Sequence, residues 1–129
     1  MTLLQQIAEY LEDQGIGTVS TDIFYSVLPD PDEGESLTIA VLENSEGMPE
    51  QEIPTNRPEF QIFIRSNTYD AGKAKYDAIK AALHSGHYAA LVSGGKYFYY
   101  IYLRSGGHLG VNPSNGKDEF SLNFYSYTR

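Results

Sequence analysis

Two runs of alternating aromatic residues dominate the last third of the chain, at residues 96–105 and 119–127. Side chains that alternate with a period of two are typical of β-strands, and aromatic residues favour strands. Four glycines separate the runs, so the pattern predicts two antiparallel strands with a glycine-rich connection. Aromatic residues fall on both faces of the first run, and we expect one face to pack on helices and the other to be covered or to form an interface. The two predicted faces consist of Tyr97, Tyr99, Ile101 and Leu103, and of Phe98, Tyr100 and Tyr102.

Two segments have the periodicity of amphipathic helices, with apolar residues every three or four positions. The first is predicted over residues 3–14, with Thr2 as N-cap and Gly15 as its stop. The second is predicted over about residues 70–85, opening at Asn67–Asp70, carrying an alanine-rich face and ending at Ser85-Gly86.

Four further strands are predicted, three of them before the second helix. The element order is therefore helix, three strands, helix, three strands, which predicts an α+β fold with two helices packed on a mostly antiparallel mixed sheet of about five to six strands. The length of 129 residues fits a single domain over residues 1–129. The four additional strands are predicted at residues 22–28, 36–42, 59–65 and 87–93.

Composition narrows the possible partners. The net charge is -8, from 9 basic and 17 acidic residues, which disfavours a protein that grips nucleic-acid phosphates or an anionic membrane. The absence of cysteine excludes disulfides and thiolate zinc sites. The sequence has neither a signal-peptide pattern at its start nor an apolar run near the roughly 20 residues that span a bilayer, so we expect no membrane contact.

Motifs for catalysis, cofactors or metals are missing or have the wrong spacing. The acidic turn 30–35 lacks a carboxylate at the twelfth position of a calcium loop, where Val41 stands. The three histidines lack a zinc-site spacing, and residues 94–96 lack the spacing of a phosphate loop. No GxSxG elbow is present. We therefore expect no enzyme activity, cofactor or metal, and an aromatic-rich ligand-binding module remains an alternative.

Two segments carry motifs that match a known family. The first is Arg57-Pro-Glu-Phe-Gln-Ile-Phe-Ile-Arg65-Ser, followed by Tyr69-Asp70 at the start of an alanine-rich helix. The second is Leu109-Gly-Val-Asn-Pro-Ser-Asn-Gly-Lys117, followed by Glu119-Phe-Ser-Leu-Asn-Phe124. These segments, together with the opening helix, resemble the minor capsid and tail terminator proteins of long-tailed bacteriophages.

The resemblance implies a structural virion protein with no catalytic role. Its subunits would form a ring, usually six-fold, that caps the tail tube at its set length and joins it to the head connector. The implied partners are further copies of the chain, the major tail tube protein and a head-completion or connector protein, with DNA only passing through the lumen. The implied location is the virion tail or neck, assembled in the host bacterial cytoplasm. A head-completion or neck adaptor protein is the alternative within the same class.

The expected interface lies on two predicted loops, 43–58 and 105–118, and on the surplus aromatic face. Long loops in compact domains are commonly functional, and these are candidates to reach a neighbouring subunit or the tube. The candidate interface residues are Glu43, Glu46, Glu50, Glu52, Arg57, Tyr100, Tyr102, Arg104, His108, Asn112 and Lys117.

Overall fold

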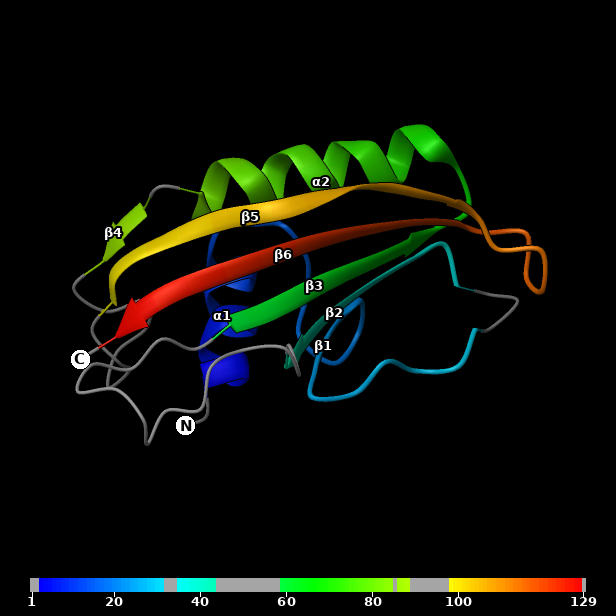
Figure 1. Cartoon of the computed structure of the whole chain (residues 1–129). Coiled ribbons are helices and arrows are strands. Elements are labelled where there is room, and N and C mark those ends of the chain that lie inside the picture. The colour runs from blue at the N-terminus through cyan, green and yellow to red at the C-terminus, as the bar shows by residue number, and fades with distance from the viewer. Residues whose placement is uncertain (1–2, 32–34, 44–58, 85, 89–97, 129) are drawn as a thin grey trace.

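The structure, a computed structural model, describes residues 3–31, 35–43, 59–84, 86–88 and 98–128 (Figure 1). Within these residues it contains two helices and six strands, and it confirms the predicted α+β fold with a mostly antiparallel mixed sheet. The elements are α1 (Leu3–Asp13), β1 (Ile23–Tyr25), β2 (Leu37–Glu43), β3 (Glu59–Ser66), α2 (Tyr69–Leu83), β4 (Gly86–Tyr88), β5 (Phe98–Val111) and β6 (Asp118–Thr128).

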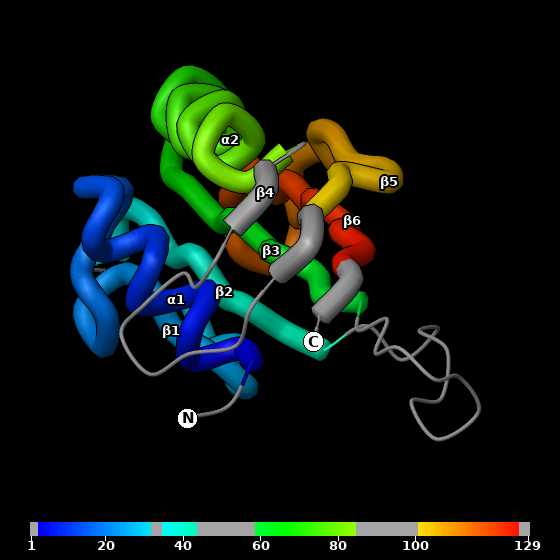
Figure 2. The backbone as a smooth tube through the Cα atoms, turned by 90° about the vertical axis from the view of Figure 1, so that its left-hand side faces the viewer, coloured from blue at the N-terminus to red at the C-terminus, as the bar shows by residue number. Residues whose placement is uncertain are grey.

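The strands form one sheet in the order β1-β2-β3-β6-β5-β4. Only β1 and β2 run parallel; the other neighbouring pairs are antiparallel. Both helices pack on the same face, with α1 over β1 and β2 and α2 over β3, β6 and β5 (Figures 1 and 2). Neither helix therefore covers the second face of the sheet.

The core lies between the helices and the sheet. In β3 every second side chain is apolar and fully buried, and the antiparallel register places three of them opposite three buried residues of β6. One pair, Phe60 and Phe124, stacks with ring centroids 5.2 Å apart. From the helices, Ile7, Leu11 and Ile79 complete this cluster. The paired residues are Phe60 and Phe124, Ile62 and Leu122, and Ile64 and Phe120.

The first helix ends as predicted at Gly15. Gly15 adopts a φ of 77°, a left-handed conformation that glycine reaches without a Cβ penalty. Its N–H donates a hydrogen bond to the carbonyl of Glu12, and the N–H of Ile16 donates one to the carbonyl of Leu11. This pair of hydrogen bonds is typical of a Schellman cap. Ile16 is itself buried, so the residue that follows the cap already packs in the core. The predicted N-cap, Thr2, lies outside the described residues.

The second helix opens where predicted but ends earlier. Thr68 is the N-cap, and its side chain accepts a hydrogen bond from the N–H of Ala71. The helix stops at Leu83, and His84 is already extended, because its Nδ1 accepts the backbone N–H of Leu103 in β5 at 3.0 Å. The predicted stop at Ser85-Gly86 is therefore wrong: Gly86 begins β4.

The predicted loop at 105–118 is also wrong, because β5 continues to Val111 and β6 begins at Asp118. Gly106, Gly107 and Gly110 belong to a bulged strand, and Gly116 lies in the turn before β6. Register shifts occur between Leu103 and Ser105 and between His108 and Gly110. At Gly106 a Cβ would lie 2.6 Å from the carbonyl oxygen of Ser121, so the close approach of the strands requires glycine there.

The two shortest strands also differ from the predicted ranges. The prediction of a strand at 22–28 is too long, because Ser26 adopts a φ of 67° and turns the chain after three residues of β1. Of the strand predicted at 87–93, the structure describes only the part that falls within β4, and residues 89–93 lie outside the described residues.

Gly72 on α2 should be intolerant of a side chain. A Cβ at this position would lie 2.3 Å from the ring of Phe120 and 2.5 Å from the Ser66 hydroxyl. Gly72→Ala should therefore lower the free energy of unfolding by about 1–2 kcal/mol. The free-energy cost of overpacking the core exceeds the gain of about 1 kcal/mol from the higher helix propensity of alanine. Urea unfolding measures this, with Ala78→Ser on the exposed side of α2 as control. A more stable Gly72→Ala variant would contradict the packing described here.

Candidate assembly surface

The helix-free face of the sheet, here named the open face, carries the alternate residues of the central strands. Because Phe60, Ile62 and Ile64 point toward the helices, their neighbours in β3 point away, as the sequence predicts. The open face is mixed in character, with carboxylates, amides and aromatic rings beside one another. In β3 and β6 it consists of Glu59, Gln61, Phe63 and Arg65, and of Glu119, Ser121, Asn123 and Tyr125.

Two of the predicted interface residues lie together at one end of this face. The ring of Tyr102 stacks on that of Tyr125, with centroids 5.6 Å apart and an angle of 17°. Arg104 forms an ion pair with Glu59 at 2.6 Å, and its side chain is 43% exposed. This end of the open face therefore offers a flat aromatic pair next to an accessible guanidinium, a composition enriched at protein interfaces.

A buried ionic cluster lies at the other end. Arg65 makes a two-pronged contact with Glu35, at 2.9 Å from Nε and 2.7 Å from Nη2, and Nη2 also donates to the carbonyl of Pro29. The Nζ of Lys117 donates to the backbone carbonyl of Glu35 and to the side-chain oxygen of Asn67. The Arg65 side chain is only 3% exposed. The cluster thereby fastens the segment leading into β2 onto β3 and the turn before β6.

Glu35 is held in its charged form by this cluster. Burial disfavours the charged carboxylate, but hydrogen bonds from Arg65 and Thr38 and the charges of Arg65 and Lys117 outweigh it, so the pKa of Glu35 is below its ordinary value. A carboxylate with a depressed pKa stabilises the fold above its unfolded pKa and ceases to do so as the pH falls. Glu35 is therefore a structural residue of the surface.

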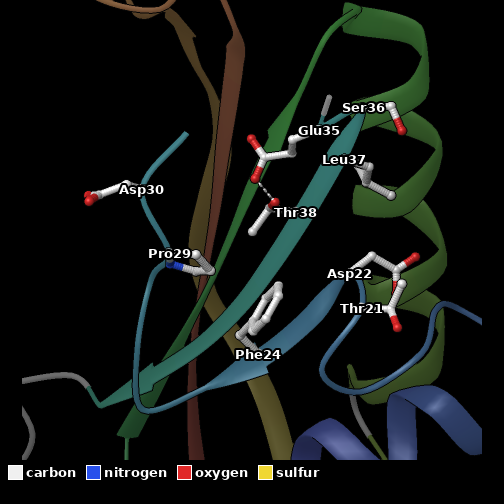
Figure 3. A pocket seen from close by; sticks show the side chains of 9 residues that line it. All are labelled: Thr21, Asp22, Phe24, Pro29, Asp30, Glu35, Ser36, Leu37 and Thr38. Atoms are coloured by element: carbon white, nitrogen blue, oxygen red, sulfur yellow. Dashed lines mark hydrogen bonds between the residues drawn. The ribbon is translucent and has the colours of Figure 1, made fainter. Parts of the chain in front are cut away.

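A hollow of about 600 Å³ opens beside this cluster, between β1, β2 and the segment that follows β1 (Figure 3). Two of its carboxylates are already engaged: Asp22 accepts the N–H of Thr18, and Glu35 turns toward Thr38. The lining includes the apolar rings of Phe24 and Pro29 and no basic residue. The described lining of the hollow therefore offers no basic group to pair with its carboxylates.

Three other predicted interface residues serve contacts within the chain. His108 Nε2 lies 3.0 Å from Asp118 Oδ1, and its ring packs 4.8 Å from that of Phe120. Asn112 shapes the turn at 112–117, because its side-chain oxygen accepts the N–H of Ser114. Lys117 is buried in the cluster with Glu35. Asn112 and Lys117 therefore shape the turn that precedes β6.

The remaining predicted residues are described in part or not at all. Glu43 ends β2 and is exposed. The backbone of Tyr100 belongs to β5, and its side chain is not described. Three glutamates and one arginine lie outside the described residues, namely Glu46, Glu50, Glu52 and Arg57.

Sequence reasoning considered Glu35 only as part of the acidic turn 30–35, and it did not single out Glu59 or Tyr125. One signal was available, since Arg65 is a charged residue within an otherwise apolar strand and implies a partner. Its partner Glu35 lies 30 residues earlier in the chain, so spacing along the sequence could not identify the pair. Glu59 and Tyr125 became visible only through the register between β3, β6 and β5.

Comparison with known proteins identifies the family. The family profile described as "Bacteriophage tail terminator protein" matches residues 10–125. The chain belongs to this tail terminator family. Its members are structural proteins of the virion, so the chain is a structural tail protein that assembles with other phage proteins in the virion. No curated protein matches the chain.

A solved structure shares the fold of this terminator-family chain. It is a chain of the structure titled "Virion of native gene transfer agent (GTA) particle", with a TM-score of 0.68 and 13% sequence identity. The alignment covers 98% of this chain and 93% of the other. Within the described residues, no helix is long and apolar enough to cross a membrane, and no three acidic or histidine side chains are grouped to hold a metal.

Glu35→Gln should destabilise the chain in a pH-dependent way. It leaves the buried guanidinium of Arg65 without its counter-ion, which should lower the free energy of unfolding by about 3 kcal/mol at neutral pH. Because the folded pKa of Glu35 is lowered, the wild type should lose this advantage as the pH falls below the ordinary value of 4.5. Urea unfolding at about pH 7 and about pH 3 measures the two differences.

The exposed residue Glu43 supplies the matched control, as Glu43→Gln makes the same chemical change away from the cluster. A stability difference between wild type and Glu35→Gln that stays constant or grows toward acidic pH would contradict the role assigned to the cluster.

Proposed function

We propose that the chain is the subunit of a six-fold ring that caps the phage tail tube when it reaches its set length and joins it to the head connector. The observation that carries the proposal is the match of the tail terminator profile over residues 10–125. The fold supports it, because both helices cover the same face of the sheet, so that neither helix covers the end of the open face that carries Tyr102 and Arg104.

The proposed mechanism is surface complementarity, without catalysis. The open face places stacked tyrosines, Tyr102 and Tyr125, next to the ion pair of Arg104 and Glu59. Aromatic rings and arginine supply most of the binding energy at many protein interfaces. We assign this end of the open face to contact with the tube protein or the connector, and we assign the residues of the segment 43–58 to the same role.

The net charge of -8 suits a ring through which DNA passes. Acidic subunits around a lumen repel phosphates, so the DNA slides without binding. Screening confines this effect to about 8 Å from the surface at physiological salt. In this proposal the ring assembles in the host bacterial cytoplasm from chains that each form one domain over residues 1–129.

A head-completion or neck adaptor protein is the second candidate. The structural similarity to a chain of a gene transfer agent virion favours keeping it, because that structure is of a whole particle and not of one ring. Both candidates join a tail to a head, and they differ in whether the protein stops tube growth.

Loss of the gene separates the two candidates. If the protein caps the tube, particles made without it should contain tail tubes of uncontrolled length, because nothing stops polymerisation at the set length. Electron microscopy of lysates with and without the gene measures the length distribution. Normal-length tails that fail to attach to heads would contradict capping and support the neck adaptor, and supplying the wild-type gene should restore normal particles.

Deletion of residues 43–52 should separate folding from capping. The variant should unfold as cooperatively as the wild type, because the core residues of β2 end at Val41. It should fail to cap tubes if this segment contacts a neighbour or the tube. A glycine–serine replacement of equal length is the control for loss of length alone, and normal capping by both variants would refute the role of the segment.

A further inference from the structure

His84 connects the end of α2 to the edge of the sheet. It follows α2 directly in an extended conformation, with φ -69° and ψ 132°, while its backbone N–H still bonds to the carbonyl of Lys80. Its side chain makes two contacts with β5. Nδ1 accepts the backbone N–H of Leu103 at 3.0 Å, and the ring lies edge-on to that of Tyr102 with centroids 5.8 Å apart. His84 therefore contacts two consecutive residues of β5.

The contact with Leu103 takes the place of a backbone hydrogen bond between strands. Gly86 of β4 pairs with Ile101 of β5, and the same antiparallel register carried two residues further would bring His84 opposite Leu103. The backbone N–H of His84 is engaged by the helix, and the imidazole supplies the acceptor for Leu103. Among the described residues no strand pairs with the outer edge of β5 beyond Ile101, so this side chain ends the ladder.

Tyr102 belongs to the end of the open face to which we assign binding of the tube protein or the connector. Its ring stacks on that of Tyr125 with centroids 5.6 Å apart, and it contacts the ring of His84 edge-on. Stacked and edge-on contacts are both favoured arrangements of aromatic rings, so the two neighbours together restrain the Tyr102 ring. This end of the open face is here named the tyrosine–arginine site, and it consists of Glu59, Tyr102, Arg104 and Tyr125.

Arg104 leaves the regular alternation of β5 directly after Leu103. The register shifts between Leu103 and Ser105, so Arg104 is the extra residue of a bulge. From there its guanidinium reaches Glu59 at 2.6 Å. A bulge re-aims a side chain, and the backbone on either side of it sets the direction. The hydrogen bond from Leu103 to His84 fixes that backbone at the residue before the bulge.

We propose that His84 is a positioning residue for the tyrosine–arginine site, and that its Nδ1 holds β5 in the course that presents Tyr102 and Arg104 to a partner. The inference rests on the proposed function of this site and adds a residue outside the site on which its geometry depends. The property that matters is an acceptor at Nδ1, so a side chain that keeps an acceptor there should replace histidine.

Three substitutions separate the acceptor from the ring. His84→Asn keeps an acceptor, because its Oδ1 is attached to Cγ as Nδ1 is in histidine; His84→Phe keeps only a ring, and His84→Ala keeps neither. The Leu103 amide should be protected from hydrogen exchange in wild type and His84→Asn, and should exchange at least about tenfold faster in the other two variants. The amide of Ile62, in the buried centre of the sheet, is the internal control and should be unchanged in every protein.

Complementation of the gene deletion gives the second readout. Each variant is supplied to particles that lack the wild-type gene, and tail lengths are measured by electron microscopy. His84→Asn should rescue tubes of the set length, whereas His84→Phe and His84→Ala should leave overlong tubes. Ala78→Ser, on the exposed side of α2, is the matched control and should restore normal tails.

Three results would overturn the proposal. Equal protection of the Leu103 amide in all variants would show that His84 does not hold this strand. Normal tubes with His84→Phe, despite a fast-exchanging Leu103 amide, would show that the contact does not position the site. Overlong tubes with His84→Asn, despite a protected amide, would show that the acceptor is not the decisive property.

Failure of the proposed function gives a different result. Normal-length tails in the gene deletion itself would refute capping, whatever the variants do. In that case attachment of tails to heads replaces tube length as the readout for the same variants, and the expected order is unchanged: His84→Asn rescues attachment, and His84→Phe and His84→Ala do not.

Discussion

The pairing of β3 with β6 at the centre of the sheet is the contact on which the hydrophobic core depends. Three buried pairs line the contact, and the helices pack over them. Because alternate side chains point to opposite faces, a slip of one residue would turn Phe60, Ile62 and Ile64 onto the open face and bring Arg65 into the core. The segments are about sixty residues apart, so the cost of closing this long loop is met by burying large side chains on both strands.

The open face depends on a second long-range constraint, the contact of Arg65 with Glu35. An arginine beside the core of a sheet is stable only with a counter-ion and full hydrogen bonding. Glu35 supplies the counter-ion, Glu35 and the carbonyl of Pro29 accept the hydrogen bonds, and Lys117 joins from the turn before β6. One buried ionic cluster thereby ties the chain that follows β1 to β3 and to the turn before β6.

Glycines accompany the irregular course of β5. In a regular strand, Arg104 and Leu109 would follow strict alternation, but the register shifts beside them leave each as an extra residue. Gly106 permits the close approach of β6 that accompanies this irregular course. Glycines that resemble a loop in the sequence thus belong to a long strand in which Arg104 and Leu109 depart from the regular alternation of side chains.

The sequence by itself determined the fold class, both helices, the faces of β3 and the family resemblance, because each depends on periodicity or on motifs local in the chain. It placed Gly15 and Thr68 near the helix ends for the same reason. Only the tertiary structure decided the end of α2, the length of β5 and the partner of Arg65. The end of α2 depends on the hydrogen bond between His84 and Leu103, and the course of β5 depends on the close approach of β6 at Gly106. The partner of Arg65 is a carboxylate thirty residues earlier in the chain. No spacing pattern in the sequence predicts such contacts, because their atoms lie far apart along the chain and only the folded sheet brings them together.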